Sequence, residues 1–210
     1  MWRFLVLALF LALAGCSEPP PAPIFHSTDI TGAEFGRSLA GLKDHRGKPA
    51  TLADFQGKAV VVFFGYTSCP DVCPTTLARF ASVLKQLGAE AERVQVLLVS
   101  VDPERDTPEK LAAYMPSFHP SFIGLYGDMP ATEAVAKEFK VFFARSKAGA
   151  SNGHAHNHDH GQAQPTENYM IDHSTGSYVF DPTGKVRLYV KDDTSVEAIV
   201  QDLKLLLAAK

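Results

Sequence analysis

Two cysteines, Cys69 and Cys73, are the only thiols of this chain outside its N-terminal segment, and three residues separate them. Two neighbouring thiols support two kinds of chemistry. They can close a disulfide, or as thiolates they can hold a thiophilic metal such as Cu(I) or Zn(II). Because a spacing of four in a helical turn puts two side chains on one face, we expect both sulfurs to converge. The competing reading is a pair of small buried residues without a role, which the local setting disfavours.

That setting is the run Val60–Pro74, which reads VVVFFGYTSCPDVCP. Its first five residues are β-branched or aromatic, which is typical of a strand buried on both faces. After a turn, Pro74 suits the first turn of a helix, where its missing N–H would be unpaired anyway, and we expect the helix to end near Gly88. A helix N-terminus carries partial positive charge, which stabilises a thiolate.

The patterns around this run predict one α/β domain. Residues 94–101 predict a second buried strand, so that strand, helix and strand form a parallel βαβ unit. Further expected elements are a helix from Pro108 capped by Thr107, a strand at 122–125, a helix at 131–139, core residues at 141–143, strands at 177–180 and 186–190, and a last helix capped by Thr194 or Ser195. This order favours a thioredoxin-like, three-layer α/β fold with a central mixed sheet and an extra hairpin, and its site belongs at the carboxyl ends of the parallel strands. The charged loop after the second strand is expected to be solvated, and the alternative is that Asp102 or Arg105 lines the site.

The N-terminal segment predicts export. Residues 1–15 carry one basic residue, Arg3, and an apolar run shorter than the roughly 20 residues that cross a bilayer. The run ends in Leu-Ala-Gly-Cys, which resembles a bacterial lipobox with Cys16 as the lipidated first residue of the mature protein. A plain cleaved signal with an incidental cysteine is the alternative. We expect a membrane-anchored lipoprotein that faces the periplasm, where disulfides persist.

The remaining chain divides into a spacer and a domain. Residues 16–27 contain the run SEPPPAP and predict a semi-rigid spacer, and residues 28–210 fit one domain of ordinary size. The formal net charge is −3, without a basic patch, which argues against a nucleic-acid partner. Lipid on Cys16 would leave one pair among the three cysteines.

Residues 146–166 form a compositionally distinct insertion, rich in small and polar residues and expected to be a mobile excursion. It contains four alternating histidines, His154, His156, His158 and His160. Such a tract binds Cu(II), Ni(II) or Zn(II) loosely when unprotonated, so we interpret it as an auxiliary metal-loading loop. A solvated insertion without function is the alternative.

The segment Phe64–Pro74 resembles the signature of the Sco/SenC family of copper-delivery proteins, which have a thioredoxin-like fold. In that family a distal histidine, shortly before a hairpin, completes a Cys–Cys–His copper site, and the context of His173 matches it. The resemblance therefore implies that His173 joins Cys69 and Cys73, with Asp172 orienting the ligand loop. Two thiolates favour Cu(I), and an imidazole lets the site also hold Cu(II).

The resemblance implies a copper chaperone that helps to assemble the copper A centre of cytochrome c oxidase. Its expected partners are the oxidase subunit carrying that centre, a periplasmic copper donor, and the membrane through the lipid anchor. Many relatives instead carry a transmembrane helix. One alternative is an enzyme, a thiol–disulfide oxidoreductase that keeps partner cysteines reduced and does not need His173. A peroxiredoxin-like peroxidase is disfavoured because Arg79 is expected on the outer side of its helix. A passive copper store or sensor stays open as a further alternative.

Overall fold

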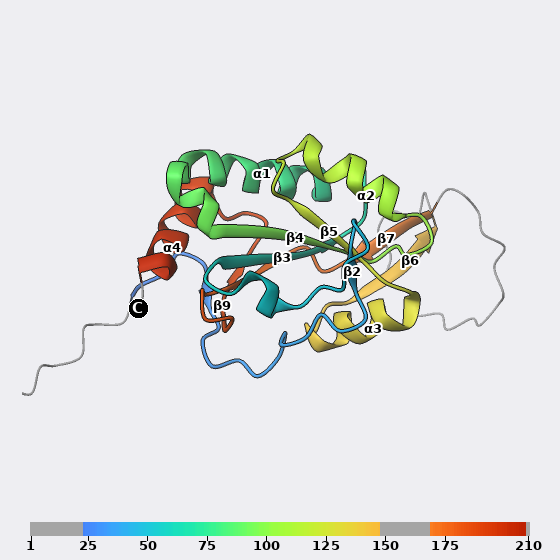
Figure 1. Ribbon diagram of the computed structural model, residues 1–210, viewed down its shortest axis with the longest axis horizontal. Helices are drawn as coiled ribbons and strands as arrows, with labels where there is room; N and C mark the ends of the chain where they lie inside the picture. The colour runs from blue at the N-terminus through green and yellow to red at the C-terminus, as the bar shows by residue number, and fades with distance from the viewer. Residues whose placement is uncertain (1–22, 148–168, 209–210) are drawn as a thin grey trace, which may run out of the picture.

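The computed structural model describes residues 23–147 and 169–208. Its centre is a seven-stranded mixed sheet in the order β1-β9-β8-β3-β4-β5-β2 (Figure 1). The strands of this sheet are β1 (Thr28–Asp29), β2 (Lys43–Asp44), β3 (Ala59–Gly65), β4 (Val94–Ser100), β5 (Ile123–Tyr126), β8 (Ser177–Phe180) and β9 (Val186–Val190). A separate antiparallel pair consists of β6 (Phe143–Lys147) and β7 (Tyr169–His173).

Helices cover both sides of the sheet. The α-helices of the described residues are α1 (Val72–Leu87), α2 (Pro108–Tyr114), α3 (Met129–Glu138) and α4 (Val196–Ala208). Short 3-10 helices are η1 (Leu52–Phe55), η2 (Gly88–Arg93) and η3 (Met115–Ser117). In Figure 1, α1 and α2 lie along one side of the sheet and α3 lies on the other, while α4 packs against α1. The predicted three-layer α/β fold with a mixed sheet is confirmed.

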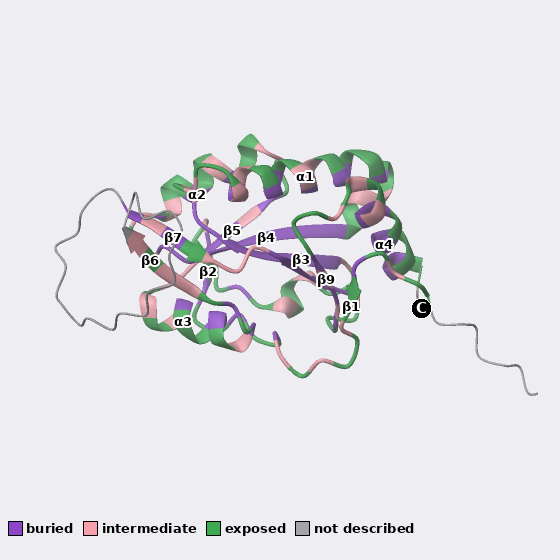
Figure 2. Cartoon of the chain, turned by 180° about the vertical axis from the view of Figure 1, so that it is seen from behind, coloured by how far each residue is buried: buried purple, intermediate pink, exposed green. Residues whose placement is uncertain are grey.

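The core of the molecule is the β3–α1–β4 unit. Every residue of β3 and of β4 is buried, and the two strands pair in parallel with Val61 opposite Val96. Figure 2 shows this central sheet as buried and the outer faces of the helices as exposed. Each fully buried valine or phenylalanine contributes about 1.5–3 kcal/mol, so this unit is a rigid base for the turn that follows β3.

Several predicted boundaries agree with the structure. Strands β8 and β9 have the expected limits, and α2 begins at Pro108 with Thr107 Oγ1 accepting the Lys110 N–H at 3.3 Å. Ser195, rather than Thr194, caps α4, since its Oγ accepts the Ala198 N–H at 3.2 Å.

Two local predictions are wrong. Helix α1 begins at Val72, so Pro74 is its third residue and Cys69 lies in the preceding turn. The sulfurs therefore do not share a helical face. The predicted position of Pro74 in the first turn is confirmed, and it is tolerated there because the first N–H groups of a helix have no partner within the helix. Phe142, expected in the core, is 65% exposed, because its backbone pairs with Ser174 while its side chain turns outward.

The loop after β4 is also unlike its prediction, because its carboxylates are buried. Asp102 and Asp106 are each only 1% exposed. Hydrogen bonds compensate this burial: Asp102 accepts from Arg105 and Tyr169, and Asp106 accepts from Ser100.

Some sequence predictions concern residues outside the described ranges: the signal peptide, Cys16, residues 16–22 of the spacer and the four-histidine tract. Strand β6 includes Ser146 and Lys147, which the sequence placed in the insertion. Within the described part of the chain, no helix is both long enough and apolar enough to cross a bilayer.

Candidate metal centre

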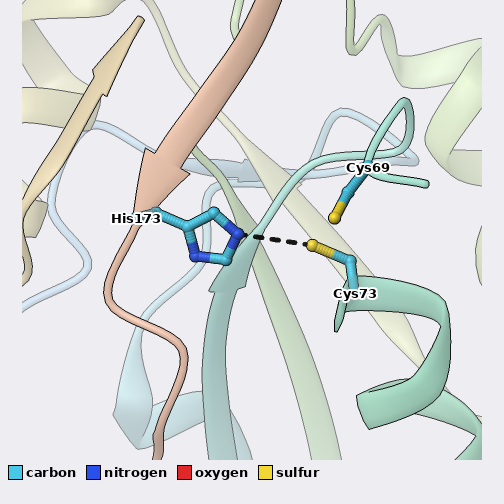
Figure 3. Close-up of side chains that lie close together, drawn as sticks. All are labelled: Cys69, Cys73 and His173. Atoms are coloured by element: carbon cyan, nitrogen blue, oxygen red, sulfur yellow. Dashed lines mark hydrogen bonds between the residues drawn. The ribbon is translucent and has the colours of Figure 1, made fainter. Parts of the chain in front are cut away.

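Cys69, Cys73 and His173 come together beyond the carboxyl end of β3. Their ligand atoms all lie within 4.8 Å of one another, and Cys73 Sγ is 3.5 Å from His173 Nε2. Figure 3 shows the three side chains pointing toward one another from a turn, a helix and a strand. Both cysteines are free thiols. The structure thus brings together the three residues that the sequence singled out. His173 comes from a strand 100 positions after Cys73 in the chain.

The turn that carries Cys69 is tied to the core by backbone and side-chain hydrogen bonds. The Val101 N–H donates to Gly65 O at 3.0 Å, and the Cys69 N–H donates to Tyr66 O at 3.3 Å. Asp106 accepts the Thr67 N–H at 3.1 Å and the Thr67 hydroxyl at 2.5 Å. These bonds hold the half-buried Cys69 against the fully buried Cys73 at the start of α1.

Gly65 makes room for the second sulfur. A Cβ atom at this position would lie 2.8 Å from Cys73 Sγ and 2.8 Å from the Phe63 ring, closer than real Cβ atoms approach. Only glycine therefore lets the end of β3 pass directly beneath the sulfur.

We expect Gly65→Ala to weaken copper binding at least about tenfold, because a displaced sulfur no longer converges with the other two ligands, and to destabilise the fold by about 1–3 kcal/mol. Competition titration with a copper chelator and urea unfolding measure the two effects. Gly124→Ala is the matched control, since its Cβ would lie 2.9 Å from Leu111, away from the sulfurs. An equal loss of copper affinity in both variants would show that stability alone governs binding.

His173 is the last residue of β7 and is half-buried. Its Nδ1 lies 3.0 Å from Ser174 O, and its ring packs edge-on against Tyr66 at 5.9 Å and Phe63 at 6.2 Å. A carbonyl beside Nδ1 keeps the proton of the neutral ring on that atom, so the Nε2 lone pair faces the sulfurs. Asp172 is exposed, so the orienting role expected of it stays a prediction, and the carbonyl of Ser174 fixes the ring.

The two thiols have opposite pKa shifts. The hydrogen bond from Cys73 is the main cause that lowers the pKa of Cys69 to about 3, and it outweighs the opposing effect of burial. The same hydrogen bond and burial raise the pKa of Cys73 well above its ordinary value. At neutral pH the pair therefore carries one proton, which sits on Cys73 and must leave when a metal takes both sulfurs.

We expect iodoacetamide to alkylate Cys69 at a rate that hardly changes between about pH 5 and 8, because its pKa of about 3 keeps it a thiolate throughout. Cys73 is 0% exposed and should react far more slowly. Peptide mass spectrometry after timed quenching measures both rates, with glutathione as the pH-dependent reference. Faster labelling of Cys73, or a rate that rises tenfold per pH unit, would contradict this assignment.

The donor set fits a soft metal ion. Two sulfurs and one imidazole suit Cu(I), and the nitrogen also allows Cu(II). A closed structural zinc site takes four protein ligands, whereas the group found in residues 23–147 and 169–208 supplies three. Three ligands with Cys69 half-exposed leave the metal accessible to an incoming ligand.

Arg79 does not serve the thiols. Its guanidinium donates to the carbonyl of Asp192 in the loop before α4, and its side chain is 13% exposed. It is thus more buried than the sequence predicted, but its partner lies away from Cys69 and Cys73. Arg79 therefore does not supply the arginine partner that a peroxidase cysteine requires.

Sequence reasoning missed Gly65, Tyr66 and Asp106, which support the ligands, and it considered Asp102 and Arg105 at the site only as the less favoured alternative. One signal was present for the carboxylates: Asp102 follows the fully buried strand β4 and the buried Val101, where the backbone has not yet left the core. Because these side chains are charged, the sequence predicted that they are exposed to solvent. Only their hydrogen-bond partners in the folded structure show how the buried charge is compensated.

Comparison with known proteins gives one consistent result. The SCO1/SenC family model matches residues 31–208. The mitochondrial SCO2 homolog of Bos taurus is 34% identical over 179 residues, which cover 84% of this chain and 62% of that protein, so the chain spans less than two thirds of the bovine relative. Among solved structures, apo Sco1 of Thermus thermophilus is 34% identical with a TM-score of 0.69, covering 87% of this chain and 97% of that one. ScoI of Bradyrhizobium japonicum with copper bound is 30% identical with a TM-score of 0.64, covering 85% and 97%.

Proposed function

The chain belongs to the SCO1/SenC family, and from that premise we propose that it carries copper on Cys69, Cys73 and His173 and delivers it to the copper A centre of cytochrome c oxidase. The observation that carries this proposal is the convergence of two sulfurs and one imidazole within 4.8 Å. The B. japonicum relative, which is similar over 85% of this chain, binds copper. The predicted family and thioredoxin-like fold are confirmed by the same comparisons.

The site has properties that suit a carrier rather than a store. Cys69 is half-exposed, so a ligand of the recipient can approach the metal from that side. Release is helped by the raised pKa of Cys73, because this thiolate regains a proton as soon as the metal leaves. The metal can therefore be exchanged one ligand at a time.

Transfer to a recipient tests the proposal directly. The reduced chain is loaded anaerobically with one Cu(I) and mixed with a copper-free, soluble copper A domain, and the metal content of both is measured after separation. We expect transfer faster than from a glutathione–copper complex. Transfer no faster than from glutathione would contradict delivery. A chain whose cysteines are first oxidised to a disulfide is the control that should not load.

A thiol–disulfide oxidoreductase is the second candidate, favoured by the asymmetry of the pair. The Cys69 thiolate would attack a partner disulfide, and Cys73 would then displace the second partner thiol, so that the partner gains two thiols and this chain keeps a disulfide. This reaction needs neither copper nor His173. Reduction of an oxidised copper A domain by the copper-free chain, without subsequent copper transfer, would favour this candidate.

The anchor is a further part of the proposal. We place the chain outside the cytoplasmic membrane, tethered through lipid on Cys16 and separated from the bilayer by residues 16–27. A SCO1/SenC family lipoprotein from Bacillus anthracis, 25% identical with a TM-score of 0.61, supports this arrangement. Fatty-acid labelling should mark the full chain and not its Cys16→Ser variant; equal labelling would contradict the anchor.

The four-histidine tract at His154, His156, His158 and His160 is proposed to add a second, weaker copper site. Changing all four to alanine should lower the Cu(II) stoichiometry to one per chain and leave the affinity of the remaining site unchanged. Titration with a Cu(II)–glycine buffer measures both quantities. Unchanged stoichiometry and unchanged delivery would remove the tract from the function.

A further inference from the structure

The strand that carries His173 is not part of the central sheet. Among the described residues β7 pairs with β6, whereas Cys69 and Cys73 follow β3 in the middle of the seven-stranded sheet. Ladder hydrogen bonds set the register of neighbouring strands, but none joins these two parts of the site. Contacts outside these strand ladders must therefore set the position of the His173 imidazole relative to the sulfurs of Cys69 and Cys73.

Asp102, Arg105 and Tyr169, here called the β7 clamp, make such contacts at the first residue of β7. The Tyr169 hydroxyl donates to Asp102 Oδ1 at 2.6 Å, and Arg105 Nη1 donates to Tyr169 O at 3.0 Å. The guanidinium of Arg105 also lies 3.6 Å from the centre of the Tyr169 ring and 2.5 Å, through Nε, from Asp102 Oδ2. Charged hydrogen bonds among largely buried groups are strong and directional, so the clamp holds both the backbone and the side chain of Tyr169.

The same loop holds the other half of the site. Four residues after Asp102, Asp106 accepts the N–H and hydroxyl of Thr67, in the turn just before Cys69. Tyr66 joins the two halves as well, because its hydroxyl accepts the Ile171 N–H at 3.2 Å and its ring packs against His173. The loop after β4 thus binds the turn that carries Cys69 through Asp106, and it binds strand β7 through Asp102 and Arg105.

We propose that Arg105, together with Asp102, is a positioning residue that holds β7 so that His173 faces the two sulfurs. This inference rests on the proposed function, since it concerns how the third ligand is supplied. Without the clamp the imidazole drifts from the metal while both thiolates stay in place. Cu(I), which two thiolates can hold, is then retained, and Cu(II), which needs the nitrogen, is bound less tightly.

The test compares Arg105→Ala with Arg145→Ala. Arg145 is the matched control because its guanidinium lies 4.5 Å from the same Tyr169 ring, yet it pairs with the exposed Glu104 instead of Asp102. We expect Arg105→Ala to lower Cu(II) affinity about 10–100-fold and to remove nitrogen coupling from the electron paramagnetic resonance spectrum, with Cu(I) affinity close to wild type. Arg145→Ala should leave all three unchanged. Arg105→Lys keeps the charge without the planar fork and should restore little of the Cu(II) affinity.

A second readout uses the copper-free chain. Amide exchange at Ile171 should accelerate in Arg105→Ala, and nuclear Overhauser contacts between the His173 and Tyr66 rings should weaken. If Arg105→Ala fails to fold, Tyr169→Phe decides, because it removes only the hydroxyl that reaches Asp102. Unchanged nitrogen coupling and unchanged Ile171 exchange in the folded variant would contradict the positioning role of Arg105 and Asp102. They would not contradict the proposed function. Absence of nitrogen coupling in the wild type would instead overturn the proposed function.

Discussion

Replacing His173 by alanine is expected to weaken Cu(II) binding by at least about 100-fold, or about 2.8 kcal/mol, while disulfide exchange by the cysteines stays largely intact. The imidazole is the nitrogen donor of the group, with Nε2 3.5 Å from Cys73 Sγ. Cu(II) prefers imidazole, whereas thiolate exchange needs only two near sulfurs. The two activities should therefore separate in this one variant.

Competition titration against a Cu(II) chelator and reduction of a small aromatic disulfide measure these effects on the same preparation. His119→Ala is the control, because the partly buried His119 ring contacts Ser121 and Phe122 rather than the site. It should match the wild type in both assays. Equal copper affinity for His173→Ala and wild type would leave only the dithiol function.

Replacing Cys73 by alanine is expected to abolish tight Cu(I) binding and to raise the pKa of Cys69 from about 3 toward its ordinary range. The copper effect follows from the loss of one of two soft ligands. The pKa effect follows because the Cys73 thiol is the main hydrogen-bond donor to the Cys69 thiolate, and removing a donor to the charged form disfavours that form.

Alkylation of Cys69 in this variant should become strongly pH-dependent, slow at pH 5 and faster at pH 8, in contrast to the flat profile of the wild type. Cys69→Ala is the comparison: it should also lose Cu(I), but its remaining thiol is buried and should alkylate slowly at every pH. A flat profile in Cys73→Ala would mean that a group other than Cys73 lowers the pKa of Cys69.

The buried parts of the fold were the most predictable from sequence. Strand β3 was predictable because its apolar run is long enough for a strand and is bounded by turn residues. The limits of β8 and β9 were predictable because the turn sequence at residues 181–185 separates them. The ligand triad came from the motif around Cys69 and Cys73 and from its likeness to a family, since periodicity alone does not select His173 from the eight histidines.

The contacts that assemble the site could not be read from local pattern. The sulfurs converge because Cys69 lies in the turn after β3 and Cys73, in the first turn of α1, packs against Gly65, not because they share a helix face. The buried positions of Asp102 and Asp106 depend on partners far along the chain or on another element, such as Tyr169 and Thr67. Long-range compensation of charge leaves no periodic trace in the sequence, so a charged loop looks solvated until its partners are known.

Anaerobic titration of the reduced chain with copper, followed by X-ray absorption spectroscopy, tests the central claim most directly. With the four histidines of the insertion changed to alanine, binding should saturate at one Cu(I) per chain with two sulfur ligands, and oxidation to Cu(II) should add a nitrogen ligand that His173→Ala removes. Saturation without sulfur ligation, or a nitrogen ligand that persists in His173→Ala, would contradict a copper site built from these three residues.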